Sequence, residues 1–196
     1  MIYPSLNAIA EQLNTSIYEK WGATINGTSE IVQLNNIASI NDEKNDLQNK
    51  IIFTLIKVEE ESSLKNSAFY TKKQPQEIVK HNPAIYLNLY ILVSITKKNY
   101  KEALQLLSDT ITFFQAHKVF TGQLPEEPKE DNFYKITIEQ HDINFQEVFD
   151  MWSNLGNKHF PSVFYKIRLL RFFDSQESKE TPVIKSIKVH YDTIDH

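Results

Sequence analysis

The most continuous hydrophobic pattern in the chain runs from Ala84 to Ile95 and is followed at once by a helical pattern. Aliphatic residues alternate with a second set that includes tyrosine and leucine, so both faces of this segment are expected to be covered, as in a central strand. Asn99 then stands at a favoured N-cap position, and apolar residues recur at steps of four and three, as on one helix face. These residues are Tyr100, Leu104, Leu107, Ile111 and Phe114.

Other periodic segments surround this unit and define the rest of the expected fold. Two further helices are predicted, at about Pro4 to Lys20 and at Asn144 to Leu155, with Gly156 as the stop of the second. Four more strands are predicted, at Glu30 to Ile40, Lys50 to Val58, Phe133 to Asp142 and Ser162 to Phe173. The sequence therefore predicts a single-domain, two-layer α+β fold, with a mixed or mostly antiparallel sheet of about five to six strands and two to three packed helices.

The apolar faces of the two outer helices have an ordinary structural interpretation. Docking onto the sheet is favoured over partner binding for the first helix, because amphipathic helices of this kind are common in globular proteins. Its apolar stripe comprises Leu6, Ile9, Ala10, Leu13 and Ile17, and the later helix places Phe145, Val148, Phe149 and Trp152 on one side.

The chain divides at about residue 174. We expect residues 1–174 to form the α+β domain and residues 175–196 to form a tethered C-terminal strand. The tail alternates from Pro182 to Tyr191, and such a strand can fold back as a sheet edge or pair with another chain. One face of this strand carries Val183, Lys185, Ile187, Val189 and Tyr191, which are candidate interface residues.

Two segments lack a periodic pattern and are predicted to be loops, Ser62 to Asn82 and His117 to Asn132. Long loops are often functional. The first contains aromatic residues beside lysines that could dock a protein partner or lie against the core. The candidate contact residues there are Phe69, Tyr70, Lys72 and Lys73.

Composition narrows the classes of function. The 196 residues carry a formal net charge of −4, which argues against nucleic acid or an anionic membrane as the main partner. The absence of cysteine excludes disulfides, thiolate nucleophiles and cysteine-based metal sites. The four glycines do not cluster into a phosphate-binding loop. No signal-peptide pattern and no apolar run of about 20 residues is visible, so synthesis in the cytoplasm is expected.

The residue pattern offers no catalytic site. The six histidines are dispersed, and no Gly-x-Ser-x-Gly motif occurs. The carboxylates of Glu59, Glu60 and Glu61 alternate sides along an extended strand, so they cannot all face one ion. We therefore predict no enzyme activity, cofactor, metal or small-molecule substrate, and a structural or interaction role. A small cytoplasmic adaptor, or an enzyme of unassigned activity, is the alternative.

Four segments in a fixed order resemble the cap proteins of extracellular contractile injection systems of the antifeeding-prophage type. They are Asn49 to Glu61, Pro83 to Ser94, Tyr100 to Gln115 and Met151 to Arg168, and the resemblance spans roughly Ile2 to Phe173. It implies a non-enzymatic tail terminator that forms a ring, expected to be a hexamer, on the distal end of the inner tube and contractile sheath. It also implies sheath and tube proteins as partners, and a final location in an assembled particle that can leave the cell.

Overall fold

The computed structural model describes residues 2–22, 30–42, 46–61, 70–74, 77–80, 85–123, 133–156, 158–172 and 181–182. Three α-helices, one 3-10 helix and nine strands fall within these residues. In chain order they are α1 (Ile2–Trp21), β1 (Val32–Leu34), η1 (Ile37–Asn41), β2 (Ile51–Glu60), β3 (Tyr70–Gln74), β4 (Glu77–Lys80), β5 (Ile85–Ile95), α2 (Tyr100–Ala116), β6 (Val119–Gln123), β7 (Phe133–Gln140), α3 (Phe145–Asn154), β8 (Ser162–Phe172) and β9 (Thr181–Pro182).

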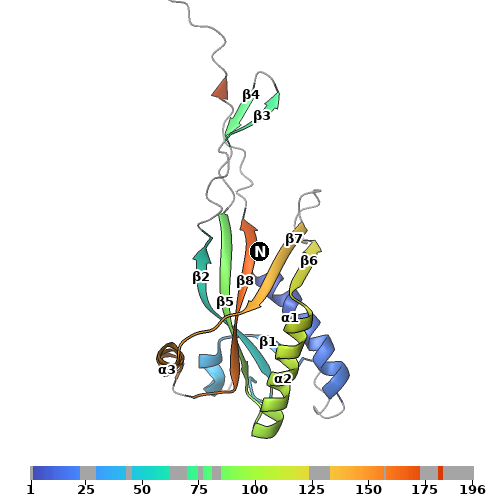
Figure 1. Cartoon of the computed structure of the whole chain (residues 1–196), viewed down its shortest axis with the longest axis vertical. Helices are drawn as coiled ribbons and strands as arrows, with labels where there is room; N and C mark the ends of the chain where they lie inside the picture. The colour runs from blue at the N-terminus through green and yellow to red at the C-terminus, as the bar shows by residue number, and fades with distance from the viewer. Residues whose placement is uncertain are drawn as a thin grey trace, which may run out of the picture.

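The hydrophobic segment that dominates the sequence becomes β5, a central strand of a six-stranded sheet with the order β1-β2-β5-β8-β7-β6 (Figure 1). β1 and β2 run parallel, and each of the other neighbouring pairs is antiparallel. Along the second half of β5 both faces are buried, as the pattern predicted, with Ile91 and Leu92 both 0% exposed. The expected single-domain α+β fold with a mixed sheet is confirmed.

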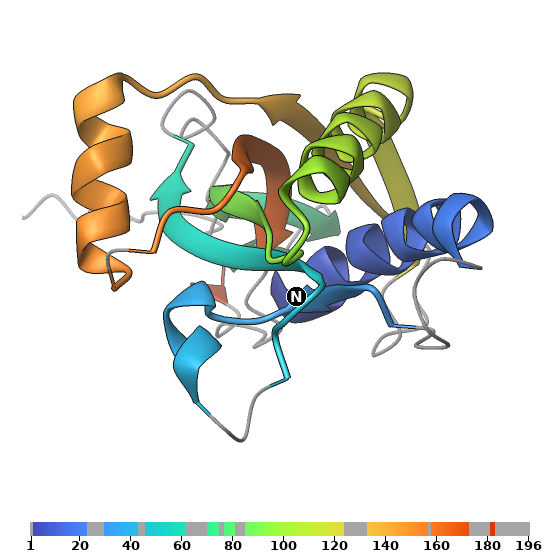
Figure 2. The same cartoon turned by 90° about the horizontal axis from the view of Figure 1, so that it is seen from below.

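Helices α1 and α2 pack against the same face of this sheet (Figure 2). The predicted stripe of α1 is confirmed, because every one of its members is buried against the sheet and α2. On the sheet side the same core contains Phe53, Ile91 and Ile167. Phe114 of α2 packs on Tyr165 of β8 with their ring centroids 4.6 Å apart.

The face that α2 buries differs from the predicted one. Tyr100, Leu104 and Ile111 are 67%, 42% and 36% exposed, so that stripe points largely outward. The buried positions include Ala103 and Thr110, which are small and let the helix approach its neighbours closely. The Thr110 hydroxyl donates to the Leu106 carbonyl 2.8 Å away, which satisfies a polar group that burial would otherwise penalise. The predicted N-cap is confirmed, since the Asn99 side chain accepts from the Lys101 N–H. The full buried set is Ala103, Leu106, Thr110, Phe113 and Phe114.

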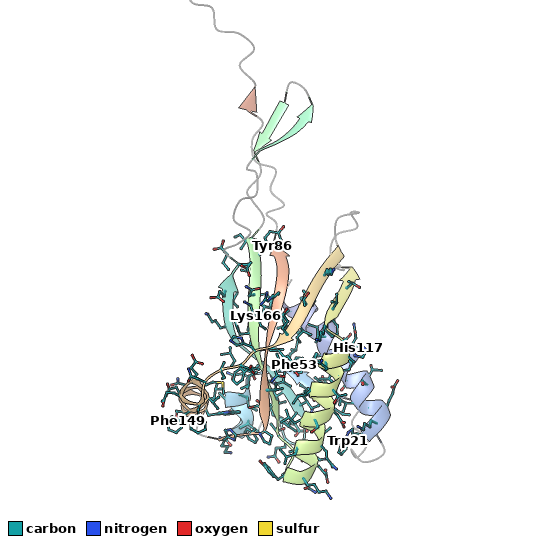
Figure 3. All side chains as sticks on the ribbon, in the orientation of Figure 1. Trp21, Phe53, Tyr86, His117, Phe149 and Lys166 are labelled. Carbon is teal, nitrogen blue, oxygen red and sulfur yellow. The ribbon has the colours of Figure 1, made fainter. Side chains whose placement is uncertain are left out.

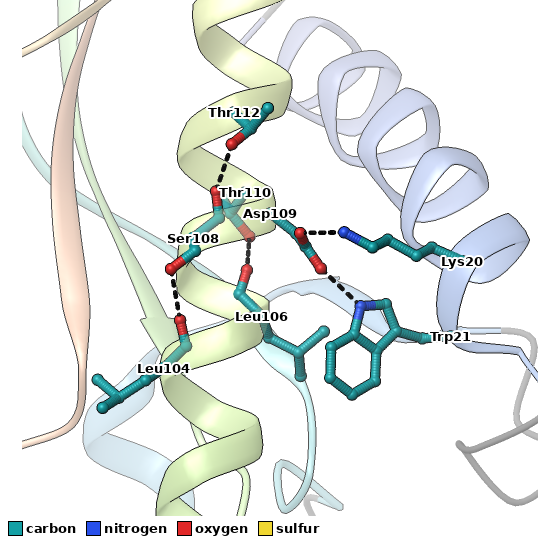
Figure 4. Close-up of polar contacts among 8 residues, drawn as sticks. All are labelled: Lys20, Trp21, Leu104, Leu106, Ser108, Asp109, Thr110 and Thr112. Atoms are coloured by element: carbon teal, nitrogen blue, oxygen red, sulfur yellow. Dashed lines mark hydrogen bonds and ion pairs between the residues drawn. The ribbon is translucent and has the colours of Figure 1, made fainter.

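The carboxylate of Asp109 in the middle of α2 joins this helix to the end of α1 (Figure 4). One oxygen of Asp109 accepts from the Trp21 indole N–H at 2.7 Å, and the other pairs with the Lys20 ammonium. This contact fixes the last turn of α1 against the middle of α2. It joins residues that no local sequence pattern links.

The second face of the sheet is covered over part of its area by α3 and η1 (Figure 2). Trp152 of α3 is 5% exposed and packs in one cluster with Ile37, Ile52 and Leu92. Asn144, expected as the first residue of the helix, is instead its N-cap and forms a reciprocal capping box with Glu147. Gly156 follows the helix with φ of 102°, a conformation that favours glycine.

Three sequence predictions of local structure were wrong. The strand expected over Glu30 to Ile40 ends at Leu34, because Asn36 caps the 3-10 helix η1 and turns the backbone away from β2. The two predicted loops contain strands, namely β3 and β4 in the first and β6 in the second. β6 has one sheet neighbour, β7, and the weak alternation of its sequence suits an edge position.

Candidate interaction surfaces

The predicted contact segment around residue 70 forms part of a β-hairpin. Phe69 lies outside the described residues, whereas the backbones of Tyr70, Lys72 and Lys73 lie in β3. β3 pairs antiparallel with β4, with Tyr70 opposite Lys80. The hairpin therefore offers ordered backbone where the sequence predicted a loop.

The C-terminal tail begins on the same hairpin. Thr181 and Pro182 form β9, which pairs antiparallel with Ile78 and Glu77 of β4. A second sheet, of order β3-β4-β9, results, and Figure 1 draws it beyond one end of the long strands. The structure thus places the start of the tail on β4, the strand that pairs with the predicted contact segment in β3. The tail residues Val183, Lys185, Ile187, Val189 and Tyr191 lie outside the described residues.

Among the described residues, no strand pairs with the outer edge of β2 along its second half. β1 pairs with β2 only as far as Phe53, after which Asn35 and Asn36 lead the chain into η1. From Leu55 to Glu60, β2 has no strand neighbour on this side within the described part of the chain. The side chains of this stretch include three exposed apolar ones, Leu55, Ile56 and Val58.

A groove of about 830 Å³ lies where β1 stops beside β2. One wall is the first turn of α1, with Ile2, Tyr3 and Leu6, and the opposite wall is the end of α3, with Met151 and Leu155. The sequence reasoning missed this site. The sequence does contain a sign of it. The predicted strand Lys50 to Val58 is long, whereas the predicted strand before it is interrupted by the consecutive asparagines Asn35 and Asn36. The groove's floor and remaining lining are Leu34, Asn35, Asn36, Phe53, Thr54, Leu55, Ile56 and Asn154.

Beyond α3, the second face of the sheet carries a polar cluster centred on Tyr90. The Tyr90 hydroxyl donates to Glu59 at 2.6 Å, and this bond, together with a hydrogen bond from Lys57, lowers the pKa of the Glu59 carboxyl. The ammonium groups of Lys57 and Lys166 each lie 5.3 Å from the Tyr90 ring centroid, and the His141 ring contacts its edge. Lys166 is labelled near the middle of the sheet in Figure 3. The cluster combines one carboxylate with two ammonium groups around an aromatic ring and has the character of a polar surface.

Helix α3 has an exposed aromatic surface. The four predicted residues share one side, but Phe145 and Phe149 are 87% and 62% exposed, whereas Trp152 is buried. Figure 3 labels Phe149 on α3. A hollow of about 220 Å³ lies among them, lined also by Val148 and His159. Exposed aromatic side chains of this size are typical of contact surfaces rather than of solvated helix faces.

The described residues contain no group of three or more acidic or histidine side chains placed to hold a metal ion. Among the helices that the structure describes, none is long and apolar enough to cross a membrane. The dispersed histidines include His141 on Tyr90 and His159, whose ring centroid lies 5.4 Å from that of Trp152, so both take part in aromatic packing.

The fold is similar to that of two solved structures. The sheath/tube terminator of the extracellular contractile injection system PVC, in its extended state, has a TM-score of 0.55 and 10% identity, and the match covers 93% of this chain and 63% of that one. The tube-terminating cap of the anti-feeding prophage has a TM-score of 0.51 and 14% identity, with 91% and 60% covered. This chain thus spans less than two thirds of the length of either structure.

Among curated proteins, none matches this chain as a relative. A family model does match, the Pvc16 N-terminal domain, over residues 6–186. The match includes both layers of helices, the whole six-stranded sheet and the β3-β4-β9 sheet. The chain therefore belongs to the Pvc16 N-terminal domain family.

Proposed function

We propose that this protein is a structural, non-enzymatic terminator of a phage-tail-like contractile injection system. The observation that carries the proposal is the family match over residues 6–186, together with a fold shared with a sheath/tube terminator and a tube-terminating cap. In this role the chain binds the distal ends of the inner tube and sheath and ends their polymerisation. Its final location is the assembled particle, after synthesis in the cytoplasm.

The surfaces of the domain support a role based on contact between proteins. A strand edge without a neighbour can pair with a strand of another chain, and exposed aromatic side chains can pack against a partner protein. In the part of the chain that the structure describes, β2 has an edge without a strand neighbour, an apolar groove lies beside it, and α3 carries an aromatic surface. A terminator has to present such surfaces to several subunits at once.

The proposed assembly is a homo-oligomeric ring, expected to be a hexamer. In a ring each subunit uses two different surfaces, one toward each neighbour. We assign the hairpin residues Phe69, Tyr70, Lys72 and Lys73 and the tail strand to these contacts, with residues 1–174 as the domain and residues 175–196 as the tethered segment. Because the tail begins at β9, which pairs with β4, the hairpin and the start of the tail lie next to each other.

Particle length tests the function directly. Deleting the gene for this chain should give tubes and sheaths of uncontrolled length in electron micrographs, since nothing stops polymerisation at the distal end. Supplying the intact chain should restore a defined length. A purified chain that stays monomeric, combined with unchanged particle length in the deletion strain, contradicts the proposal.

Truncation separates assembly from folding. A chain that ends at Pro182 keeps the pairing of β9 with β4 and loses residues 183–196. It should unfold at the same temperature as the intact chain and form fewer rings, as measured by mass in solution. If truncation lowers the melting temperature of the monomer strongly, the tail strand pairs within its own subunit and not with a neighbour.

A further inference from the structure

The backbone geometry of β2 shows where a further strand can be added. The Ile51 N–H donates to Ile31 and the Phe53 carbonyl accepts from Asn35, so these two residues direct their backbone groups toward the β1 side. Because backbone groups alternate in direction along a strand, the N–H and carbonyl of Leu55 also point toward the β1 side. Ile56 is then an extra residue between Leu55 and Lys57 in the pairing with β5, which shifts the register by one.

The extra residue Ile56 forms a β-bulge. After it, Val58 is the next residue whose backbone groups point toward the outer edge of β2. The Glu61 N–H donates to Tyr86 of β5 at 2.8 Å, so the residues at 57, 59 and 61 direct their backbone groups inward, toward β5. The backbone N–H and carbonyl of Val58 therefore point away from β5, as do those of Leu55. Val58 is 44% exposed and Leu55 is 39% exposed, so the edge is reachable.

The groove beside this edge has the shape required by a strand. A strand laid along β2 as a continuation of β1 would direct alternate side chains to opposite faces of the sheet. On one face they would meet Ile2, Tyr3 and Leu6 of α1, and on the other Met151 and Leu155 of α3. Both walls are apolar, which favours an occupant with β-branched residues on both faces.

The C-terminal segment of the chain has the matching composition. Val183 to Tyr191 alternates, contains four aliphatic β-branched residues and spans about 30 Å when extended, longer than the exposed part of β2. It carries Lys185 and Lys188 and no acidic residue, whereas β2 ends in the acidic run Glu59 to Glu61. Opposite charges on neighbouring strands favour pairing.

We propose that, in the ring, the open edge of β2 accepts the segment Val183–Tyr191 of a neighbouring copy as an added strand. This inference rests on the proposed ring and names the acceptor surface within it. Thr181 and Pro182 anchor the start of the donated strand on β4 of its own chain. Each subunit then donates a strand to one neighbour and accepts one from the other, as a closed head-to-tail ring requires.

The absence of cysteine from the natural sequence makes a clean cross-linking test available. Chains carrying V58C are mixed with chains carrying one cysteine at a position from Val183 to Tyr191, assembled, and oxidised mildly. Covalent dimers of one chain of each kind are counted by mass, and ring formation is measured in the same sample. The matched control is V119C, because Val119 is 50% exposed on β6, the strand at the other edge of the sheet.

The expected result is a yield of mixed dimers that rises and falls with a period of two along the tail. At its maximum the yield from V58C should exceed that from V119C roughly fivefold or more, because a disulfide needs Cβ atoms about 4 Å apart. Rings that form with equal yields from the two edges overturn the acceptor assignment and leave the terminator function standing. The assignment is also overturned if cysteines at both positions of one chain close within that chain while mixed chains fail to cross-link. If the natural chain forms no ring under the same conditions, the proposed ring and the acceptor assignment are both overturned, and particle length in the deletion strain then tests the terminator function separately.

A second variant avoids dependence on disulfide geometry. V58K places a charge at the outward position of β2, a change that blocks strand addition in natural sheets. It should reduce the ring fraction while leaving the monomer's melting temperature unchanged, and V119K should reduce it less. Equal effects of the two lysine variants on ring formation contradict the proposal.

Discussion

Removing the carboxylate of Asp109 tests whether α1 and α2 are held together as the structure indicates. The Asp109 side chain is 18% exposed, and it accepts a part-buried hydrogen bond from the Trp21 indole N–H at 2.7 Å. A hydrogen bond to a charged group contributes about 2 kcal/mol. Lys20 is 64% exposed, so its ion pair contributes only about 0.5 kcal/mol. D109A also gains about 0.5 kcal/mol from the better helix propensity of alanine.

The net expected cost of D109A is therefore about 2 kcal/mol in the free energy of unfolding. For a chain of 196 residues this corresponds to a fall in melting temperature of about 4 to 8 °C. Denaturation by urea, followed by circular dichroism, measures the cost. Double-mutant cycles with W21F and K20A then divide it between the two contacts.

The structure requires the coupling of Asp109 to Trp21 to exceed its coupling to Lys20. The opposite order would refute the reasoning, since it would mean that the exposed ion pair holds the helices together. A cost for D109A below about 0.5 kcal/mol, the usual effect of a surface substitution, would refute it as well.

Three further predictions follow from burial and from the polar cluster on the sheet. L89A should cost about 2 to 5 kcal/mol in unfolding free energy, measured by urea denaturation, because Leu89 is 0% exposed. F149A should change the same free energy by less than about 0.5 kcal/mol, since that ring is 62% exposed, and a loss comparable to that of L89A would show that α3 is packed differently. The pKa of Glu59 is lowered, first by the Tyr90 hydrogen bond, so its stabilising contribution is complete above the ordinary carboxyl pKa and is lost as pH falls below 4.5. E59Q should therefore show a shallower fall in stability than the natural chain below that pH, and parallel curves from pH 5 to pH 3 would contradict the assignment.

Hydrophobic patterning alone determined the central elements of this protein. The run Ala84 to Ile95 predicts a strand buried on both faces, and the structure places it in the middle of the sheet. The ends of helices were also predictable, because Asn99 and Asn144 act as caps through contacts within a few residues. Local chemistry and periodicity suffice wherever the deciding contacts are near in sequence.

Tertiary packing decided which of several plausible helix faces is buried. In α2 two apolar stripes lie one residue apart, and the sheet and α1 select the one with Ala103 and Thr110, which permits a closer approach. In α3 the sequence groups Phe149 with Trp152, but only Trp152 reaches the sheet. Burial depends on what stands opposite a side chain, which the sequence of one helix does not contain.

Tertiary structure also decided the surfaces that we propose for assembly. The sequence identified the tail and the segment around residue 70 as contact candidates, and the structure places the start of the tail and the residue 70 segment on the two sides of β4. The groove along β2 arises from segments distant in sequence, at the place where α1 begins and β1 and α3 end. Strand edges and grooves are defined by missing neighbours, so they become visible only when every strand has been placed.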